Sequence, residues 1–153
     1  MADRHNRDLD RQPAPLPEPL PVPCVDVHAH IEIVTDAAAD SDAVGQVIAD
    51  AASVGVNRIV QVGYSAEQSQ WCVAAAEKWN TSVLATVALH PNEAPVVADL
   101  AADLAIIEKL AQHPRVRAIG ETGLDYYYEP ESAELQQASF RLHLEAARIT
   151  GKP

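Results

Sequence analysis

The chain has 153 residues, of which 48% are hydrophobic, and it carries a formal net charge of −11. This length is enough for one domain with a real core. The acidic balance argues against tight, sequence-independent binding to nucleic acid, which depends on Lys and Arg. No apolar run reaches the ~18 residues of a membrane helix, and no secretion signal begins the chain. We therefore expect a cytoplasmic protein with no membrane contact.

Residues 1–23 differ in composition from the rest of the chain. A charged stretch ends at Arg11, and proline then occupies every second position from Pro13 to Pro23. Proline lacks an N–H and fixes φ, so this segment cannot join a helix or a central strand and favours an extended polyproline conformation. The alternation never gives the i, i+3 spacing of a P-x-x-P ligand. We predict a disordered, semi-rigid arm rather than an SH3-type ligand.

From Cys24 onward, apolar strands alternate with amphipathic helices. Ser65 and Gln68 have the spacing of a capping box, and Pro95 suits the first turn of a helix. The pattern predicts a strand from Cys24, strands over 58–63, 82–89 and 116–120, and helices over 41–54, 65–79, 95–112 and 131–149.

Apolar spacing also predicts which residues are buried. The two cysteines, Cys24 on the first strand and Cys72 on a helix, are expected to be small buried hydrophobes rather than a disulfide. The last helix carries one apolar stripe, formed by Leu135, Ala138, Leu142, Ala146 and Ile149.

Four β–α units with short loops imply a parallel sheet covered by helices, an α/β fold. A doubly wound sheet would have a glycine-rich turn after its first strand, and residues 26–30 contain no glycine. A TIM barrel would have polar chemistry at the carboxyl ends of several strands, as found here, but it needs eight units and ~250 residues. We therefore predict a TIM-barrel type fold whose first four βα units are residues 24–153, a fragment that ends before strand five.

Two histidines mark the end of the first expected strand. His28 and His30 are spaced i, i+2, so in an extended segment both side chains point to the same side and can converge on one ion. Glu121 follows the fourth expected strand, where a metal ion or a salt bridge would offset the cost of burying its charge. The carboxyl ends of parallel strands meet at one edge, so the sequence predicts a metal site there.

Several motifs together resemble the TatD-type metal-dependent hydrolases, over essentially all of residues 24–153. These motifs are Asp26-Val27-His28-Ala29-His30, Leu89-His90-Pro91-Asn92-Glu93-Ala94, Gly120-Glu121-Thr122-Gly123-Leu124-Asp125-Tyr126-Tyr127, and Gln136-x-x-x-Phe140-x-x-His143-Leu144 before Gly151-Lys152-Pro153. The resemblance implies a barrel of the amidohydrolase-like group that binds divalent metals and hydrolyses phosphodiester bonds, chiefly in DNA.

The resemblance also implies roles for individual residues. His28 and His30 would be metal ligands, and Glu121 would be a catalytic ligand able to bridge two divalent ions (Mg, Mn or Zn). The family's remaining ligands, two histidines and an aspartate, lie on strands five, six and eight, which this sequence does not contain. One further departure is Glu32, where family members usually have an aspartate.

Residues near the expected site have open roles. His90 either contacts the substrate phosphate or is a structural loop histidine. Asp125 either orients a ligand from the second shell or caps a local turn, and we favour the turn. The run Tyr126-Tyr127-Tyr128 could stack bases, but we favour packing of a loop over the barrel mouth.

Three functions remain open from the sequence. The first is a metal-dependent deoxyribonuclease or phosphodiesterase with nucleic acid as its substrate rather than a stable partner. The second is hydrolysis of an ester or amide bond at the same kind of site, as in D-aminoacyl-tRNA deacylation. The third is a catalytically inactive half-barrel or interaction module. For the 153-residue chain alone we expect negligible hydrolase activity and self-association, because a half-barrel exposes unpaired strand edges.

Overall fold

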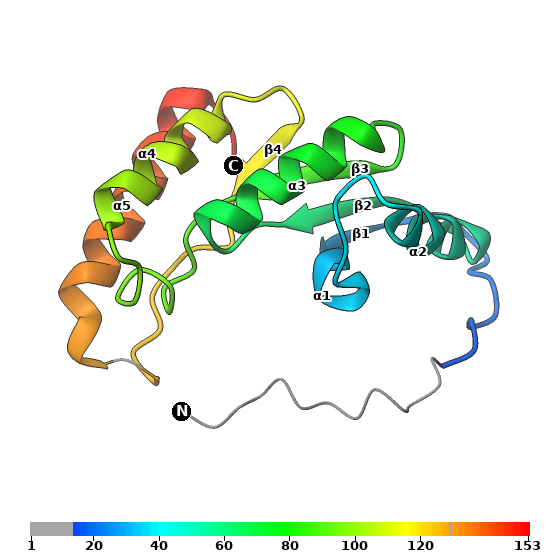
Figure 1. The fold of residues 1–153 in the computed structure, drawn as a ribbon, viewed down its shortest axis with the longest axis horizontal. Coiled ribbons are helices and arrows are strands. Elements are labelled where there is room, and N and C mark those ends of the chain that lie inside the picture. Colours follow the sequence, from blue (N-terminus) through cyan, green and yellow to red (C-terminus); the bar gives the residue numbers. More distant parts are fainter. Residues whose placement is uncertain (1–13, 129) are drawn as a thin grey trace.

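Four parallel strands form the only sheet among residues 14–128 and 130–153, the part of the chain that the computed structural model describes (Figure 1). The strands are β1 (Cys24–Ala29), β2 (Val56–Val62), β3 (Val83–Val87) and β4 (Val116–Ile119). They lie in the order β1-β2-β3-β4, and each pairs in parallel with the next. The predicted α/β fold with four βα units is confirmed. A doubly wound sheet would reverse its strand order, and this one does not.

Helices follow the strands in chain order across the sheet, as Figure 1 shows. The main helices are α2 (Asp42–Ser53), α3 (Ala66–Lys78), α4 (Leu100–Ala111) and α5 (Ala133–Thr150). Two short elements that the sequence did not predict are α1 (Ile31–Thr35) and a 3₁₀ turn (Pro130–Ser132). The Ser65 hydroxyl caps α3 as predicted by accepting the Gln68 N–H at 3.1 Å.

The core lies between the sheet and the helices α2, α3 and α4. Its centre includes Ile59, Val83, Val87, Cys72 and Ile107, all buried. Burial of Cys72 is confirmed, but the prediction for Cys24 is wrong, because that thiol is exposed. β1 is an outer strand of the described sheet, and all of its residues except Ala29 are exposed.

The predicted start of the third helix is wrong. Pro95 lies in a series of turns, and α4 begins five residues later, after Asp99. The reason is the capping chemistry, because the Asp99 carboxylate accepts the Ala102 N–H at 3.0 Å. The bond satisfies one of the backbone N–H groups that have no partner inside the first turn of a helix. Proline has no side-chain acceptor that could do the same.

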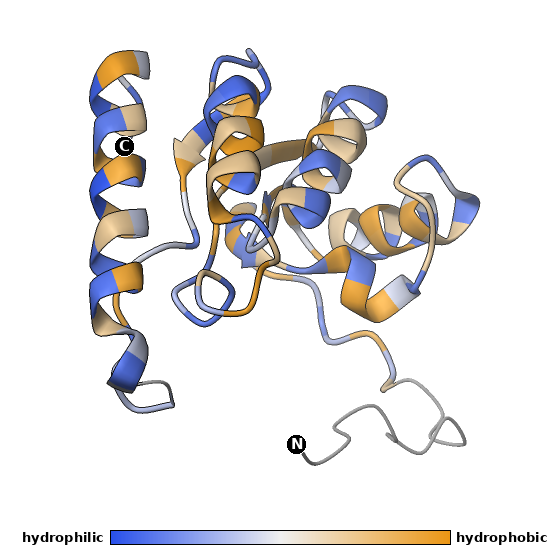
Figure 2. Ribbon diagram, turned by 60° about the vertical axis from the view of Figure 1, so that its left-hand side comes forward, coloured by the Kyte–Doolittle hydropathy of each residue, from blue (hydrophilic) through white to orange (hydrophobic). Residues whose placement is uncertain are grey.

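The apolar stripe of α5 is not the face that the helix buries. Of its apolar stripe, only Ala146 is buried, whereas Leu135, Leu142 and Ile149 are exposed. The helix instead buries the polar residues of a neighbouring face: Gln136, Ser139 and His143. In Figure 2 hydrophobic and hydrophilic residues alternate along α5, which lies at one side of the molecule.

Both ends of the described chain contact the sheet region. The prediction of a disordered arm falls partly on residues 1–13, outside the described residues. In the described part of that segment, the Leu20 N–H donates to the Val54 carbonyl at 2.9 Å. At the other end, the Ile119 N–H of β4 donates to the Pro153 carbonyl at 2.8 Å. Within the described residues, no helix has the length and hydropathy needed to cross a bilayer.

The exposed outer strand leads to a prediction about association. Val27 on β1 is 70% exposed, and open strand edges pair readily with other chains. We expect the 153-residue chain to self-associate, and Val27→Lys to reduce this without loss of stability. Light scattering after size exclusion over a range of concentrations measures the effect.

The matched control is Val96→Lys, since Val96 is 59% exposed but lies in a turn away from the sheet edge. Equal reduction by both substitutions would contradict an edge mechanism, and a monomer at every concentration would contradict self-association itself.

Candidate metal centre

The histidine pair lies at the carboxyl end of β1. His28 is in the strand and His30 is the residue that precedes α1. The His28 N–H donates to the Asp26 carboxylate at 3.0 Å. This bond fixes the backbone between Asp26 and His28. The rings of His28 and His30 meet edge to face with centroids 5.2 Å apart. Their i, i+2 spacing therefore brings both imidazoles to one place, as predicted.

Glu121 reaches this place from β4 by crossing the end of β3. Its N–H donates to the Gly63 carbonyl at the end of β2, at 2.9 Å. β3 lies between these two strands in the sheet. The crossing is possible because Ala88 and Leu89, which follow β3, bond to side chains instead of to neighbouring strands.

The Gly63 position has no room for a side chain. A Cβ there would lie 2.5 Å from the Ser69 hydroxyl oxygen and 2.9 Å from the Thr86 carbonyl oxygen. Both distances are shorter than any carbon–oxygen contact, and the second atom is backbone. Glycine is therefore what allows the ends of β2 and β3 and the start of α3 to meet beside Glu121.

The three predicted ligands converge. His28 Nε2 lies 3.5 Å from Glu121 Oε2, and His30 Nε2 lies 3.7 Å from the same oxygen. One ligating atom from each residue fits within 4.8 Å of the others. Two ligands about 2.1 Å from a tetrahedral ion are about 3.4 Å apart, so these separations fit one divalent ion.

His30 is supported by two residues that the sequence analysis did not assign to the site. Glu32 Oε1 lies 3.4 Å from His30 Nδ1, within ion-pair range, and neither atom has a hydrogen-bond partner among the described residues. The Gln61 amide holds Glu32 by donating to its Oε2, and it accepts the Ile31 N–H at 2.9 Å. A carboxylate at Nδ1 directs the Nε2 lone pair toward an ion. Glutamate in the place of the family's aspartate still reaches the ring.

His90 faces the other carboxylate oxygen of Glu121, Oε1, rather than the Oε2 that faces the histidine pair. Its Nδ1 accepts the Asn92 N–H at 3.1 Å, and its Nε2 lies 3.6 Å from Glu121 Oε1. Because Nδ1 accepts a hydrogen bond, the neutral ring carries its proton on Nε2. His90 therefore presents a hydrogen-bond donor to the site, whereas an ion would need a lone pair there. The geometry separates His90 from the three ligands.

Asp125 makes the local turn that we favoured from the sequence. Its Oδ1 accepts the N–H groups of Tyr127 and Tyr128, at 3.0 and 3.4 Å. These bonds and the Asn92 amide, 3.2 Å from Oδ2, lower the pKa of the half-buried Asp125 carboxyl. The same Asn92 bonds His90, so Asp125 also contacts the loop that carries that ring.

The tyrosine run does not pack as we favoured. Tyr126, Tyr127 and Tyr128 are all exposed, and the side chain of Tyr127 is the most open of them at 84%. The rings of Tyr127 and Tyr128 contact only edge to face, with centroids 4.9 Å apart. Of the three, Tyr126 contacts α5, where its hydroxyl accepts the Gln137 amide N–H at 3.0 Å.

Other histidines do not extend the ligand set. His113 pairs with Glu77 at 3.0 Å, and His143 is buried on α5. Burial lowers the pKa of His143, because the charged ring would lose its hydration. His5 lies outside the described residues. The only group of three or more possible metal ligands in the described part of the chain is therefore His28, His30 and Glu121.

Comparison with known proteins identifies the family. The model of the TatD related DNase family matches residues 25–153. The chain belongs to this family. The segment that matches the TatD family includes His28, His30, Glu121 and His90.

This TatD-family chain aligns with part of the length of several named relatives. A Mycobacterium tuberculosis (strain ATCC 25618 / H37Rv) protein, named as an uncharacterized metal-dependent hydrolase TatD, is 40% identical over 76% of this chain and 45% of its own length. A Musicola paradisiaca (strain Ech703) protein, named as a 3′-5′ ssDNA/RNA exonuclease TatD, is 35% identical over 75% of this chain and 42% of its own. The chain thus spans less than half the length of these curated relatives.

A solved structure confirms the architecture. The TatD homologue YJJV of Escherichia coli K12 superposes with a TM-score of 0.68 at 24% identity, covering 84% of this chain and 48% of the other. At that identity the likeness concerns the fold alone. The four βα units are therefore part of a TIM barrel, as the sequence predicted.

The ligand geometry predicts divalent-ion binding by the chain itself. We expect Co²⁺ to bind, and His30→Ala or Glu121→Gln to weaken binding at least about tenfold, since each removes one of three donors. Visible absorption during titration measures this. His113→Ala, at a histidine outside the site, is the control, and equal weakening by it would contradict the assigned ligands.

The buried imidazole predicts a pH dependence of stability. The pKa of His143 is lowered from 6.5 in the folded chain, so the unfolded chain takes up the proton first as pH falls. Stability is thus retained above about pH 6.5 and lost as pH falls through the folded pKa. His143→Gln keeps an acceptor but cannot titrate, so its free energy of unfolding should fall less with pH. Urea unfolding at several pH values tests this, and parallel curves would exclude His143 as the cause.

Proposed function

We propose that residues 24–153 supply the first part of the metal centre of a hydrolase that cleaves phosphodiester bonds in single-stranded nucleic acid. The observation that carries the proposal is the convergence of His28, His30 and Glu121, whose ligating atoms lie within 4.8 Å of one another. These residues come from two strands far apart in sequence, and all three belong to the segment that matches the family.

Glu121 is placed to serve two positions at once. Its Oε2 faces His28 and His30, while its Oε1 faces His90. A carboxylate with both oxygens available can bridge two ions, so we propose a pair of divalent ions (Mg, Mn or Zn), with His28 and His30 holding one. Ions bound there would supply positive charge to the phosphate and a nucleophile at neutral pH.

His90 would act on the substrate rather than on an ion. Its Nε2–H is directed into the site by the Asn92 N–H that occupies Nδ1. A donor of this kind suits a phosphate oxygen beside the ions. Glu121 Oε1 at 3.6 Å is the nearest carboxylate facing it, and it keeps the ring oriented before substrate arrives.

Three observations support nucleic acid as the substrate. The family is named for DNases, and one relative is named for an exonuclease of single-stranded DNA and RNA. The net charge of −11 disfavours clamping of long duplexes and fits attack on ends. The exposed tyrosines that follow Glu121 offer rings on which unpaired bases can stack. A cytoplasmic location is part of the proposal.

A chimera tests the function. Residues 24–153 replace the matching segment of the Musicola paradisiaca exonuclease, and a 5′-labelled single-stranded oligonucleotide is the substrate. We expect Mg²⁺- or Mn²⁺-dependent shortening from the 3′ end, loss with chelator, and a rate roughly 100-fold lower for Glu121→Gln. Glu77→Gln, at an exposed acid away from the site, is the control. The 153-residue chain alone should be inactive.

The alternative functions give different outcomes. Release of the amino acid from a D-aminoacyl-tRNA without nuclease activity would indicate an ester hydrolase. A folded, metal-binding chimera with neither activity would indicate an inactive module. Activity that resists chelator would contradict the metal-dependent mechanism altogether.

A further inference from the structure

Helix α5 faces the sheet with a stripe of buried polar side chains. Gln136 and His143 are 0% and 1% exposed. Burying polar groups costs free energy unless each finds a partner. The partners here are backbone groups of the two segments that carry the site, the end of β3 and the turn after Glu121.

Gln136 holds the turn after Glu121 by both ends of its amide. Its Oε1 accepts the Asp125 N–H at 2.7 Å, and its Nε2 donates to the Asp125 carbonyl at 2.9 Å. The amide thus supplies one acceptor and one donor to the backbone of Asp125, as a residue of a neighbouring strand would do in a sheet. The Asp125 carboxylate then contacts Asn92, whose N–H orients His90.

His143 and Ser69 hold the end of β3. His143 Nε2 accepts the Leu89 N–H at 2.9 Å, while its Nδ1–H donates to the Ser139 carbonyl at 2.8 Å. The Ser69 hydroxyl of α3 accepts the Ala88 N–H at 3.2 Å and lies 3.3 Å from the Ala88 carbonyl oxygen. The backbone just before His90 is thus satisfied by two helices, from outside the sheet.

This arrangement has a consequence for Glu121. With Ala88 and Leu89 bonded outward, the Gly63 carbonyl of β2 is available, and it accepts the Glu121 N–H. If the end of β3 stayed in line with the sheet, it would lie between Glu121 and Gly63, because β3 separates β2 from β4. The position of Glu121 therefore depends on side chains that do not touch it.

We propose that Ser69, Gln136 and His143 are positioning residues: buried polar groups on α3 and α5 that hold the two strand ends so that Glu121 and His90 face each other. The proposal depends on the proposed function only for what the site binds. The positioning itself belongs to the metal-free chain, so the two can fail separately.

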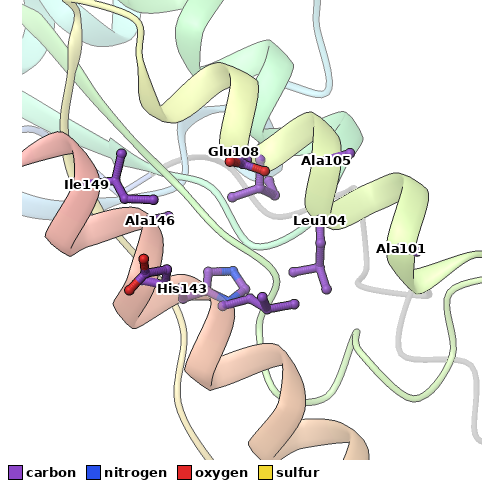
Figure 3. Close-up of a pocket in the computed structure, with 10 residues that line it drawn as sticks. Ala101, Leu104, Ala105, Glu108, His143, Ala146 and Ile149 are labelled. Carbon is purple, nitrogen blue, oxygen red and sulfur yellow. The ribbon is translucent and has the colours of Figure 1, made fainter.

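The neighbourhood of His143 decides which substitutions are informative. Its ring projects from α5 into the space between α4 and α5, where it helps line an apolar groove of about 260 Å³ (Figure 3). A small substitute would enlarge this groove and destabilise the core for an unrelated reason. His143→Leu keeps most of the volume and removes the acceptor, while His143→Gln restores an acceptor for Leu89.

Hydrogen exchange in the metal-free chain, read residue by residue by NMR, tests the proposal. We expect His143→Leu, Gln136→Leu and Ser69→Ala to lower protection of the Glu121 and His90 amides by about tenfold relative to core amides of β2 such as Ile59. His143→Gln should restore it. Gln137→Leu is the matched control, because that amide contacts only side chains, Tyr126 and Arg141.

The outcomes separate positioning from general stability. A uniform loss of protection in β2 and at Glu121 would mean that these residues only stabilise the fold, and would overturn the proposal. So would unchanged Glu121 protection in all three variants. Ser69→Ala creates almost no cavity, so it remains informative if the Leu variants do not fold. Co²⁺ titration of the same proteins should show weakening of roughly 10- to 100-fold, and absence of binding in the wild type would contradict the proposed function alone.

Discussion

The hydrogen bond from the Glu121 N–H to the Gly63 carbonyl is the contact on which the arrangement of the site depends. It joins β4 to β2 across the end of the strand between them. This contact requires a glycine at position 63, because Ser69 and the Thr86 carbonyl leave no space for a Cβ. It also requires that β3 end early, with its last backbone groups bonded to helices. Once those conditions are met, a carboxylate arrives beside two histidines that their own strand already presents on one side.

The charges of the side chains at this site favour the binding of a cation. Three imidazoles and two carboxylates meet with separations between 3.4 and 3.7 Å. Each carboxylate faces imidazole nitrogens in these contacts and no Lys or Arg, so no permanent cation balances its charge. A divalent ion would supply that charge and bind the lone pairs of the ligands. His90 differs from the other two rings because its loop already occupies Nδ1, so it contributes a proton where they contribute lone pairs.

The sequence predicted what local spacing and strand polarity determine. His28 and His30 converge because of their i, i+2 spacing, and Glu121 joins them because parallel strands end at one edge. The errors arose where tertiary contacts decide. Pro95 could have begun a helix, but Asp99 offered the better cap. The inward face of α5 is set by polar bonds to Leu89 and Asp125, which no hydrophobic period reveals. Ser69 and Gln61 carried no signal, and Gln136 and His143 stood only in a family motif with no role, since the role of a buried polar residue is visible only once its backbone partner is placed.

The order of the strands has a consequence for how the chain folds. Each strand pairs only with its neighbours in sequence, for example Cys24 with Val56 and Ile59 with Val83. Every pairing in the described sheet therefore closes a loop of similar, moderate length. Loop-closure entropy rises slowly with length, so such a sheet can grow one unit at a time from any starting pair. Damage to one strand would then first affect the strands that pair with it.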